Sequence, residues 1–139
     1  MRRRRLLATL GSGLAAVGAG CTALGTVGGG VDGDVGMTAE AFEPARITVA
    51  PGEEVVWYNN SVRAHSVTAY DEGIPEGAEY FATGGYDSAE AAREAWDGMH
   101  GAITNGQTYR HTFEVPGRYN YFCIPHERAG MVGTVVVEE

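Results

Sequence analysis

The sequence predicts an all-β protein, a Greek-key β-sandwich with one short helix in an insertion around residues 88–98. From residue 41 onward, short runs rich in β-branched and aromatic residues alternate with Gly and Pro turns. Many short strands separated by such turns are typical of a sandwich. The stretch SAEAAREAWDG is different, because it is rich in Ala and either Ser88 or the preceding Asp87 can cap its start. We therefore expect a helix over 88–98.

Turn residues and alternation place the individual strands. Strands are expected at residues 45–49, 54–58, 66–69, 108–115, 118–122 and 132–137. Pro51-Gly52 and Pro116-Gly117 are suited to turns between consecutive strands. Val55 and Trp57 alternate onto one face of their strand, which predicts that this face packs into the core.

The N-terminal region reads as a leader and a tether. Residues 1–21 begin with four arginines, continue with a short apolar stretch and end in a lipobox-like Cys21, which is the layout of a signal peptide. Residues 22–40 are Gly-rich with little apolar mass, so they predict a flexible tether. Residues 41–139 form the predicted domain. We expect export, with a lipid on Cys21 that anchors the protein to the outer face of the cell membrane.

The charge of the chain limits its partners. All ten basic residues are Arg, and from Cys21 onward six of them face all 18 acidic residues, a net charge near −12. This balance argues against nucleic acid or an anionic membrane surface as a direct partner. It is compatible with a basic protein partner, but we favour an adaptation of solubility to high salt, where charge is screened.

The most specific functional pattern is C-x2-H-x4-M, formed by Cys123, His126 and Met131. Cys123 follows a strand and Pro125 ends it, so one short loop can aim a thiolate, an imidazole and a thioether at one point. His65, at another strand boundary, is placed to supply a second imidazole. Two imidazoles, a thiolate and a weak thioether are the ligands of blue-copper electron-transfer sites. We therefore predict one copper ion that cycles between Cu(I) and Cu(II).

Four motifs extend this pattern along the chain. They are F-x-P-x-x-I-T-V-x-P-G from Phe42, V-x-W-x-N from Val55, H-S-V from His65, and P-G-x-Y-x-Y-F-C-x-P-H-x4-M from Pro116. With them, residues 41–138 resemble the plastocyanin type of cupredoxin, and most closely the halocyanins of salt-loving archaea. The resemblance implies a copper-binding sandwich that carries single electrons outside the cytoplasm. It implies that His65 and His126 are the imidazole ligands, Cys123 the thiolate ligand and Met131 the axial ligand.

Two features depart from this resemblance. Ser66 and Ile124 stand where many relatives have an Asn and a Ser or Thr that brace the two ligand loops. We expect the brace to be lost or to be made by the backbone. Because Pro125 has no N–H, we expect one amide, that of Ser66, to donate to the Cys123 sulfur. The second departure is an insertion centred on residues 71–100, whose role the sequence does not indicate.

These inferences favour a monomeric, exported electron carrier, not an enzyme, that serves redox partners such as membrane electron-transfer complexes. A copper-handling or storage protein with the same ligands is the alternative. A hydrolase or redox enzyme that uses Cys123 as nucleophile and His126 as base is a third hypothesis. We expect His111 to be a packed strand residue and His100 to be a surface residue. Phe122 alternates away from the Cys123 face, which predicts either a surface aromatic or a remote electron entry.

Overall fold

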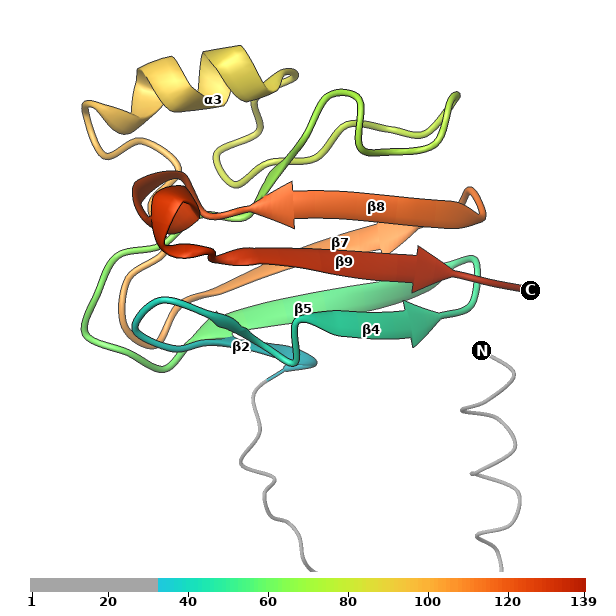
Figure 1. The fold of residues 1–139 in the computed structure, drawn as a ribbon, viewed down its shortest axis with the longest axis horizontal. Coiled ribbons are helices and arrows are strands. Elements are labelled where there is room, and N and C mark those ends of the chain that lie inside the picture. Colours follow the sequence, from blue (N-terminus) through green and yellow to red (C-terminus); the bar gives the residue numbers. More distant parts are fainter. Residues whose placement is uncertain (1–32) are drawn as a thin grey trace, which may run out of the picture.

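The computed structural model describes residues 33–139, which form two facing sheets (Figure 1). The elements are β2 (Val35–Met37), β3 (Phe42–Glu43), β4 (Arg46–Val49), β5 (Glu53–Asn59), β6 (Thr68–Ala69), α3 (Ala89–Trp96), β7 (Thr108–Phe113), β8 (Gly117–Phe122), the 3₁₀ helix η2 (Ile124–Ala129) and β9 (Val132–Val137). The predicted leader and Cys21 lie outside the described residues. Within residues 33–139 no helix is long and apolar enough to cross a membrane.

Each sheet has four strands, in the order β3-β2-β5-β7 in one and β4-β9-β8-β6 in the other. The pairs β5–β7 and β8–β9 are antiparallel, whereas β2–β5 and β4–β9 are parallel. The predicted fold class, an all-β sandwich with one short helix, is therefore confirmed for the described part of the chain. The ends of the predicted strands also agree with the observed ones to within two residues, and the predicted helix is one residue too long at its start and two residues too long at its end.

The sheet begins before the predicted domain boundary at residue 41. The prediction of a tether over 22–40 is wrong for Val35–Met37, because these residues form β2, are buried and pair with both β3 and β5. The strand has only three residues, and the middle one is a glycine, so it carries too little apolar pattern to be recognised from the sequence. Their hydrogen bonds come from β5, a segment about twenty residues further along the chain, so local sequence alone does not reveal them.

Alternation along β8 brings Cys123 to one end of the core. Tyr119 and Tyr121 point into the sandwich, and Cys123 continues on the same face as a member of the buried core cluster, as predicted. The Trp57 ring meets Tyr121 edge to face at 5.4 Å between centroids. The Tyr119 hydroxyl donates to the Val115 carbonyl at 2.6 Å, which fixes the start of β8 against the preceding turn.

The insertion covers the outer surface of β6 and β8. Helix α3 begins after Ser88, whose side chain accepts a hydrogen bond from the Ala91 amide at 3.1 Å. Figure 1 shows α3 outside the sandwich, beside the end of β8. From this helix the Arg93 guanidinium lies 4.3 Å from the centre of the Phe122 ring and pairs with Glu127 of η2 at 2.8 Å. The insertion therefore links the outer face of the sheet to the loop between His126 and Met131.

Phe122 is consequently buried, and the expectation of a surface aromatic is wrong. Its side chain points away from the main core as predicted, yet its exposed fraction is 0%. The Tyr70 ring packs against it at 4.4 Å between centroids, and Arg93 covers the remaining side. The connection between β6 and β7, which carries Tyr70 and Arg93, makes this second apolar layer.

We predict that Arg93→Ala lowers the free energy of unfolding by about 1 kcal/mol, because it removes a cation–π contact and uncovers part of Phe122. Chemical denaturation measures the loss. Arg110→Ala is the matched control, since Arg110 pairs with Glu54 on an exposed sheet surface at 3.4 Å and lies over no aromatic ring of residues 33–139. That control should lose less than about 0.5 kcal/mol. Equal losses in the two variants would contradict the proposed packing of Arg93 on Phe122.

Candidate metal centre

The loop after β8 is closed by backbone hydrogen bonds between its two ends. The Cys123 amide donates to the Met131 carbonyl at 3.1 Å, and the Met131 amide donates to the His126 carbonyl at 3.2 Å. Pro125 stands in the first turn of η2, and Gly130 ends that helix with φ of 93°. Because this left-handed conformation disfavours residues with a Cβ, a Gly is suited to the reversal that leads to Met131. Cys123, His126 and Met131 are thus held by one tight loop.

His65 comes from a second loop, between β5 and β6. Its amide donates to the Ile103 carbonyl at 3.0 Å, and the Ile103 amide donates back to the His65 carbonyl at 2.8 Å. Ile103 follows the insertion over residues 71–100. The chain therefore rejoins the sandwich next to the loop that carries His65. Sequence reasoning missed this partner, because a single Ile that follows Gly-Ala and precedes two polar residues shows no strand pattern.

The structure brings three of the four predicted residues together with their ligand atoms facing one another. The Sγ atom of Cys123 lies 3.5 Å from Nδ1 of His65 and 3.5 Å from Nδ1 of His126. The three ligand atoms all lie within 4.8 Å of one another. His65 and Cys123 are buried, and His126 is half-buried, so one edge of the cluster approaches solvent. Met131 is fully buried, at the neck of the same loop.

The remaining histidines lie away from this cluster. His111, in β7, is half-buried and stacks on Phe81 with centroids 4.8 Å apart, which confirms the prediction of a packed strand residue. His100 is exposed after the end of α3, as expected for a surface residue.

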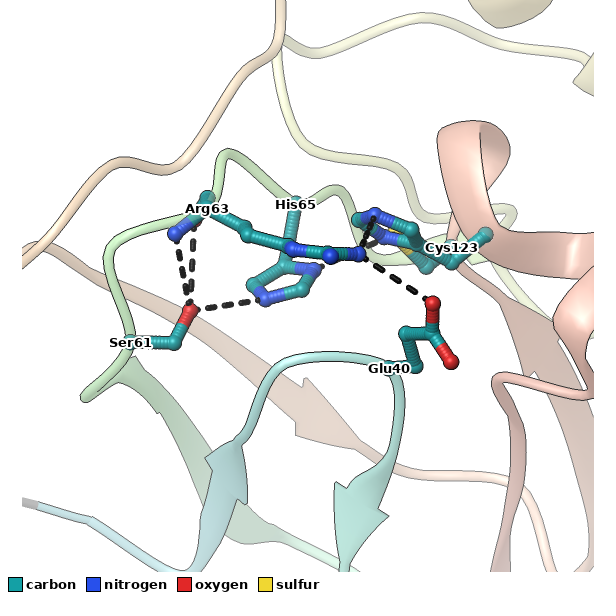
Figure 2. A network of polar contacts seen from close by, with 6 residues as sticks. Glu40, Ser61, Arg63, His65 and Cys123 are labelled. Carbon is teal, nitrogen blue, oxygen red and sulfur yellow. Dashed lines mark hydrogen bonds and ion pairs between the residues drawn. The ribbon is translucent and has the colours of Figure 1, made fainter.

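Ser61 and Asn59 orient the His65 ring, and Figure 2 shows the Ser61 side chain facing that ring. Nε2 of His65 lies 3.0 Å from the Ser61 hydroxyl, which donates in turn to Oδ1 of Asn59 at 2.9 Å. In this arrangement Nε2–H donates to Ser61, so Nδ1 carries the free lone pair and faces Cys123. Sequence reasoning missed both residues, although Asn and Ser at the end of a strand are typical of side chains that organise a loop.

Ser66 joins the two ligand loops. Its amide donates to Sγ of Cys123 at 3.4 Å, as predicted, and its hydroxyl accepts a hydrogen bond from the Ile124 amide at 2.9 Å. The same hydroxyl lies 3.0 Å from that of Thr68. The brace therefore persists although Ile124 has no polar side chain, because the backbone of Ile124 supplies the donor. Of the two alternatives that the sequence left open, the backbone brace is the one observed.

Burial controls the protonation of the metal-free cluster. It raises the pKa of the Cys123 thiol to about 11, against the opposing effect of the hydrogen bond from the Ser66 amide. Burial, followed by repulsion from His126, lowers the pKa of His65 to about 4. Burial, with the nearby charge of Arg63, also lowers the pKa of His126. At neutral pH both imidazoles are therefore neutral and able to donate a lone pair, whereas the thiol must lose its proton to become a ligand.

The donor set fits copper by its chemistry. A thiolate and a thioether are soft ligands that suit Cu(I), and two neutral imidazoles suit Cu(II). A structural zinc site would more often gather four strong Cys and His ligands, whereas the described cluster offers three.

Comparisons with known proteins identify the family. A family model described as copper-binding proteins of the plastocyanin/azurin family matches residues 30–138. Plastocyanin from Scenedesmus fuscus is 34% identical over 100 residues, which are 72% of this chain and 89% of that protein. Plastocyanin from Rumex obtusifolius is 34% identical over 110 residues, 79% of this chain and 95% of that protein. The chloroplastic plastocyanin of Tetradesmus obliquus is 34% identical as well, but the match covers 60% of its length.

Solved structures agree with this result. Amicyanin from Paracoccus versutus is 32% identical with a TM-score of 0.53, and the match covers 75% of this chain and 78% of amicyanin. A pseudoazurin from Sinorhizobium is 31% identical with a TM-score of 0.54, covering 76% of this chain and 72% of that protein. Because the family model spans most of the chain and the fold, the buried Cys/His cluster and the relatives agree, this chain belongs to the plastocyanin/azurin family: it is a copper-binding blue copper protein of the cupredoxin fold, and not an enzyme.

Proposed function

We propose that this protein is an exported, lipid-anchored, monomeric carrier that shuttles single electrons between membrane redox complexes. We further propose that His65, Cys123, His126 and Met131 hold its copper. The observation that carries the proposal is the convergence of Nδ1 of His65, Sγ of Cys123 and Nδ1 of His126 within 4.8 Å. When bound, copper would supply a reversible one-electron couple.

The residues around the cluster support a carrier. Electron exchange is fast when the ligands hardly move between oxidation states, so a carrier needs ligands whose positions are fixed in advance. His65 is oriented by Ser61, the Cys123 sulfur accepts from the Ser66 amide, and the neck of the loop is closed by Met131. Of the three clustered residues, His126 is half-buried and the other two are buried, so a redox partner approaches the cluster at the edge of the His126 ring. A copper-storage protein has no need of such rigidity.

The position in the cell is part of the same proposal. The basic, apolar and small-residue segments of residues 1–21 support export, and the lipobox-like Cys21 supports a lipid anchor. The acidic excess and absence of Lys support the halocyanin-like branch of the family. Mass measurement of the mature N-terminus tests the anchor, since a diacylglyceryl group on Cys21 adds a defined mass and a plain signal-peptide cleavage does not.

We predict that the copper-loaded protein shows an intense thiolate-to-copper absorption band towards the red end of the visible spectrum and that Cys123→Ser abolishes it. The hydroxyl of Ser is not a soft ligand, so no such charge transfer can arise. Absorption spectroscopy after titration with Cu(II) measures the band. Reversible cycling of the wild type at an electrode completes the test. A band without reversible cycling would favour the copper-handling alternative, and a band retained in Cys123→Ser would refute the ligand assignment.

A second variant tests the brace between the loops. Ser66→Ala leaves the Ile124 amide without its acceptor, so the free energy of unfolding of the metal-free protein should fall by about 1–2 kcal/mol. Copper should also dissociate faster, because the loops lose one of their links. Thr134→Val is the matched control: it removes a hydroxyl that bonds Asn120 at 2.9 Å, away from the cluster. If both variants release copper at the wild-type rate, Ser66 does not hold the loops together.

The lowered pKa of His65 gives a pH dependence. The unfolded chain takes up a proton on this side chain near pH 6.5, whereas the folded, metal-free protein does so near pH 4. Stability is therefore full above pH 6.5 and is lost as the pH falls from about 6.5 to 4, by up to about 3 kcal/mol. Denaturation of the metal-free protein across this range measures the slope. The carboxylates also change the stability over this pH range, and subtracting the pH slope measured for His65→Asn removes their contribution. Identical pH slopes for the wild type and His65→Asn would contradict a buried, neutral His65.

A further inference from the structure

A charge pair lies at the solvent edge of the His126 ring. Nη1 of Arg63 is 3.5 Å from Nε2 of His126, and the same nitrogen pairs with Oε2 of Glu40 at 3.2 Å. Both charged side chains are about half exposed, at 48% for Arg63 and 53% for Glu40. Figure 2 shows the guanidinium extending across the cluster from the loop that carries His65, with the Glu40 carboxylate opposite it.

The backbone of Arg63 belongs to the network that orients His65. Its amide donates to the Ser61 hydroxyl at 3.2 Å, and its carbonyl accepts from Nδ2 of Asn59 at 2.7 Å. These bonds use no side-chain atom of Arg63. The backbone of Arg63 is therefore held in place beside the cluster. Substitution can remove the guanidinium charge without breaking the hydrogen bonds that orient His65.

The contact between Arg63 and His126 is electrostatic when His126 serves as a ligand through Nδ1, the atom that faces Cys123 at 3.5 Å. Nε2 then carries the ring hydrogen and cannot accept a hydrogen bond from the guanidinium. What remains is a positive charge beside the ring edge. Electron uptake lowers the charge at the cluster by one unit, so a nearby cation favours the reduced state and a nearby anion favours the oxidised state.

We propose that Arg63 and Glu40 together set the reduction potential of the copper site from its solvent edge, Arg63 raising it and Glu40 lowering it. Arg63 contacts His126 directly, whereas Glu40 contacts Arg63, so the effect of Arg63 is the larger. The electron comes from the redox partner, and no bond is formed or broken in the step. This inference rests on the proposed ligand set, and it adds two residues that touch neither copper nor substrate and act through the charge they place beside His126.

The test compares Arg63→Gln, Glu40→Gln and the double variant by spectroelectrochemical titration at low ionic strength. Arg63→Gln should shift the redox equilibrium threefold to tenfold towards the oxidised form, about 30 to 60 mV for a one-electron couple. Glu40→Gln should shift it in the opposite direction, and the double variant should return towards the wild type. Competition with chelators gives a second readout on metal-free protein: the ratio of Cu(I) to Cu(II) affinity should fall by the same factor in Arg63→Gln.

Two controls separate charge from structure. Arg63→Lys keeps the charge and should keep the potential, whereas a purely structural role would make it shift as Arg63→Gln does. Neutralising the exposed pair of Arg110 and Glu54 on the β5–β7 sheet should leave the potential unchanged. All shifts should shrink in molar salt, where screening shortens to about 3 Å.

The proposal is overturned if Arg63→Gln leaves the potential within the spread of the Arg110 controls, or if Glu40→Gln shifts it in the same direction. A wild-type protein without the thiolate–copper band would overturn both this inference and the ligand set. A normal band with an unmoved potential would overturn the role of Arg63 alone.

Discussion

The two hydrogen bonds of Ser66 are the interaction on which the metal centre depends. The cluster needs a thiolate from one loop and an imidazole from another, and these residues are separated by 58 positions in the chain. Folding brings the loops to the same end of the sandwich, but sheet pairing alone does not join them to each other. Ser66 does so by donating its amide to the Cys123 sulfur and accepting from the Ile124 amide. With the two loops joined, the hydrogen bonds between Asn59 and Ser61 and between Ser61 and His65 orient the imidazole ring relative to Cys123.

The insertion extends this frame to the outer side of the ligand loop. Arg93 reaches Glu127, which follows His126 directly, and the Tyr70 hydroxyl donates to the same carboxylate at 2.6 Å. These contacts lower the pKa of Glu127, the pairing with Arg93 being the largest cause. The loop is thus held from inside by the bond between Cys123 and Met131, and from outside by α3. A helix inserted far away in sequence can therefore restrain a ligand loop without contributing a ligand.

Much of this could be predicted from the sequence. Turn residues and alternation located most strands, because a half-buried strand shows its pattern locally, and the C-x2-H-x4-M spacing brought three chemically matched residues into one loop. What escaped prediction depends on long-range pairing. β2 is a strand because β5 lies beside it, and Phe122 is buried because Arg93 folds over it. The hydrogen bond between Ile124 and Ser66 could not be predicted for another reason. Its donor is a backbone amide, and every residue except Pro has one, so the side chain at position 124 does not indicate it.

The placement of arginines follows from the charge of the chain. From Cys21 onward the chain has six Arg against 18 acidic residues, so its solubility comes from the negative charges and not from the arginines. The long-range attraction of an arginine is also weak in salt, because the Debye length is about 8 Å or less. An arginine can still act at contact distance. Two of the described arginines make such contacts at the ligand loop: Arg93 with Glu127, and Arg63 with the edge of His126. One restrains the loop and the other places a charge beside it. Because screening acts least at these separations, both effects weaken less in salt than the effects of more widely separated surface charges.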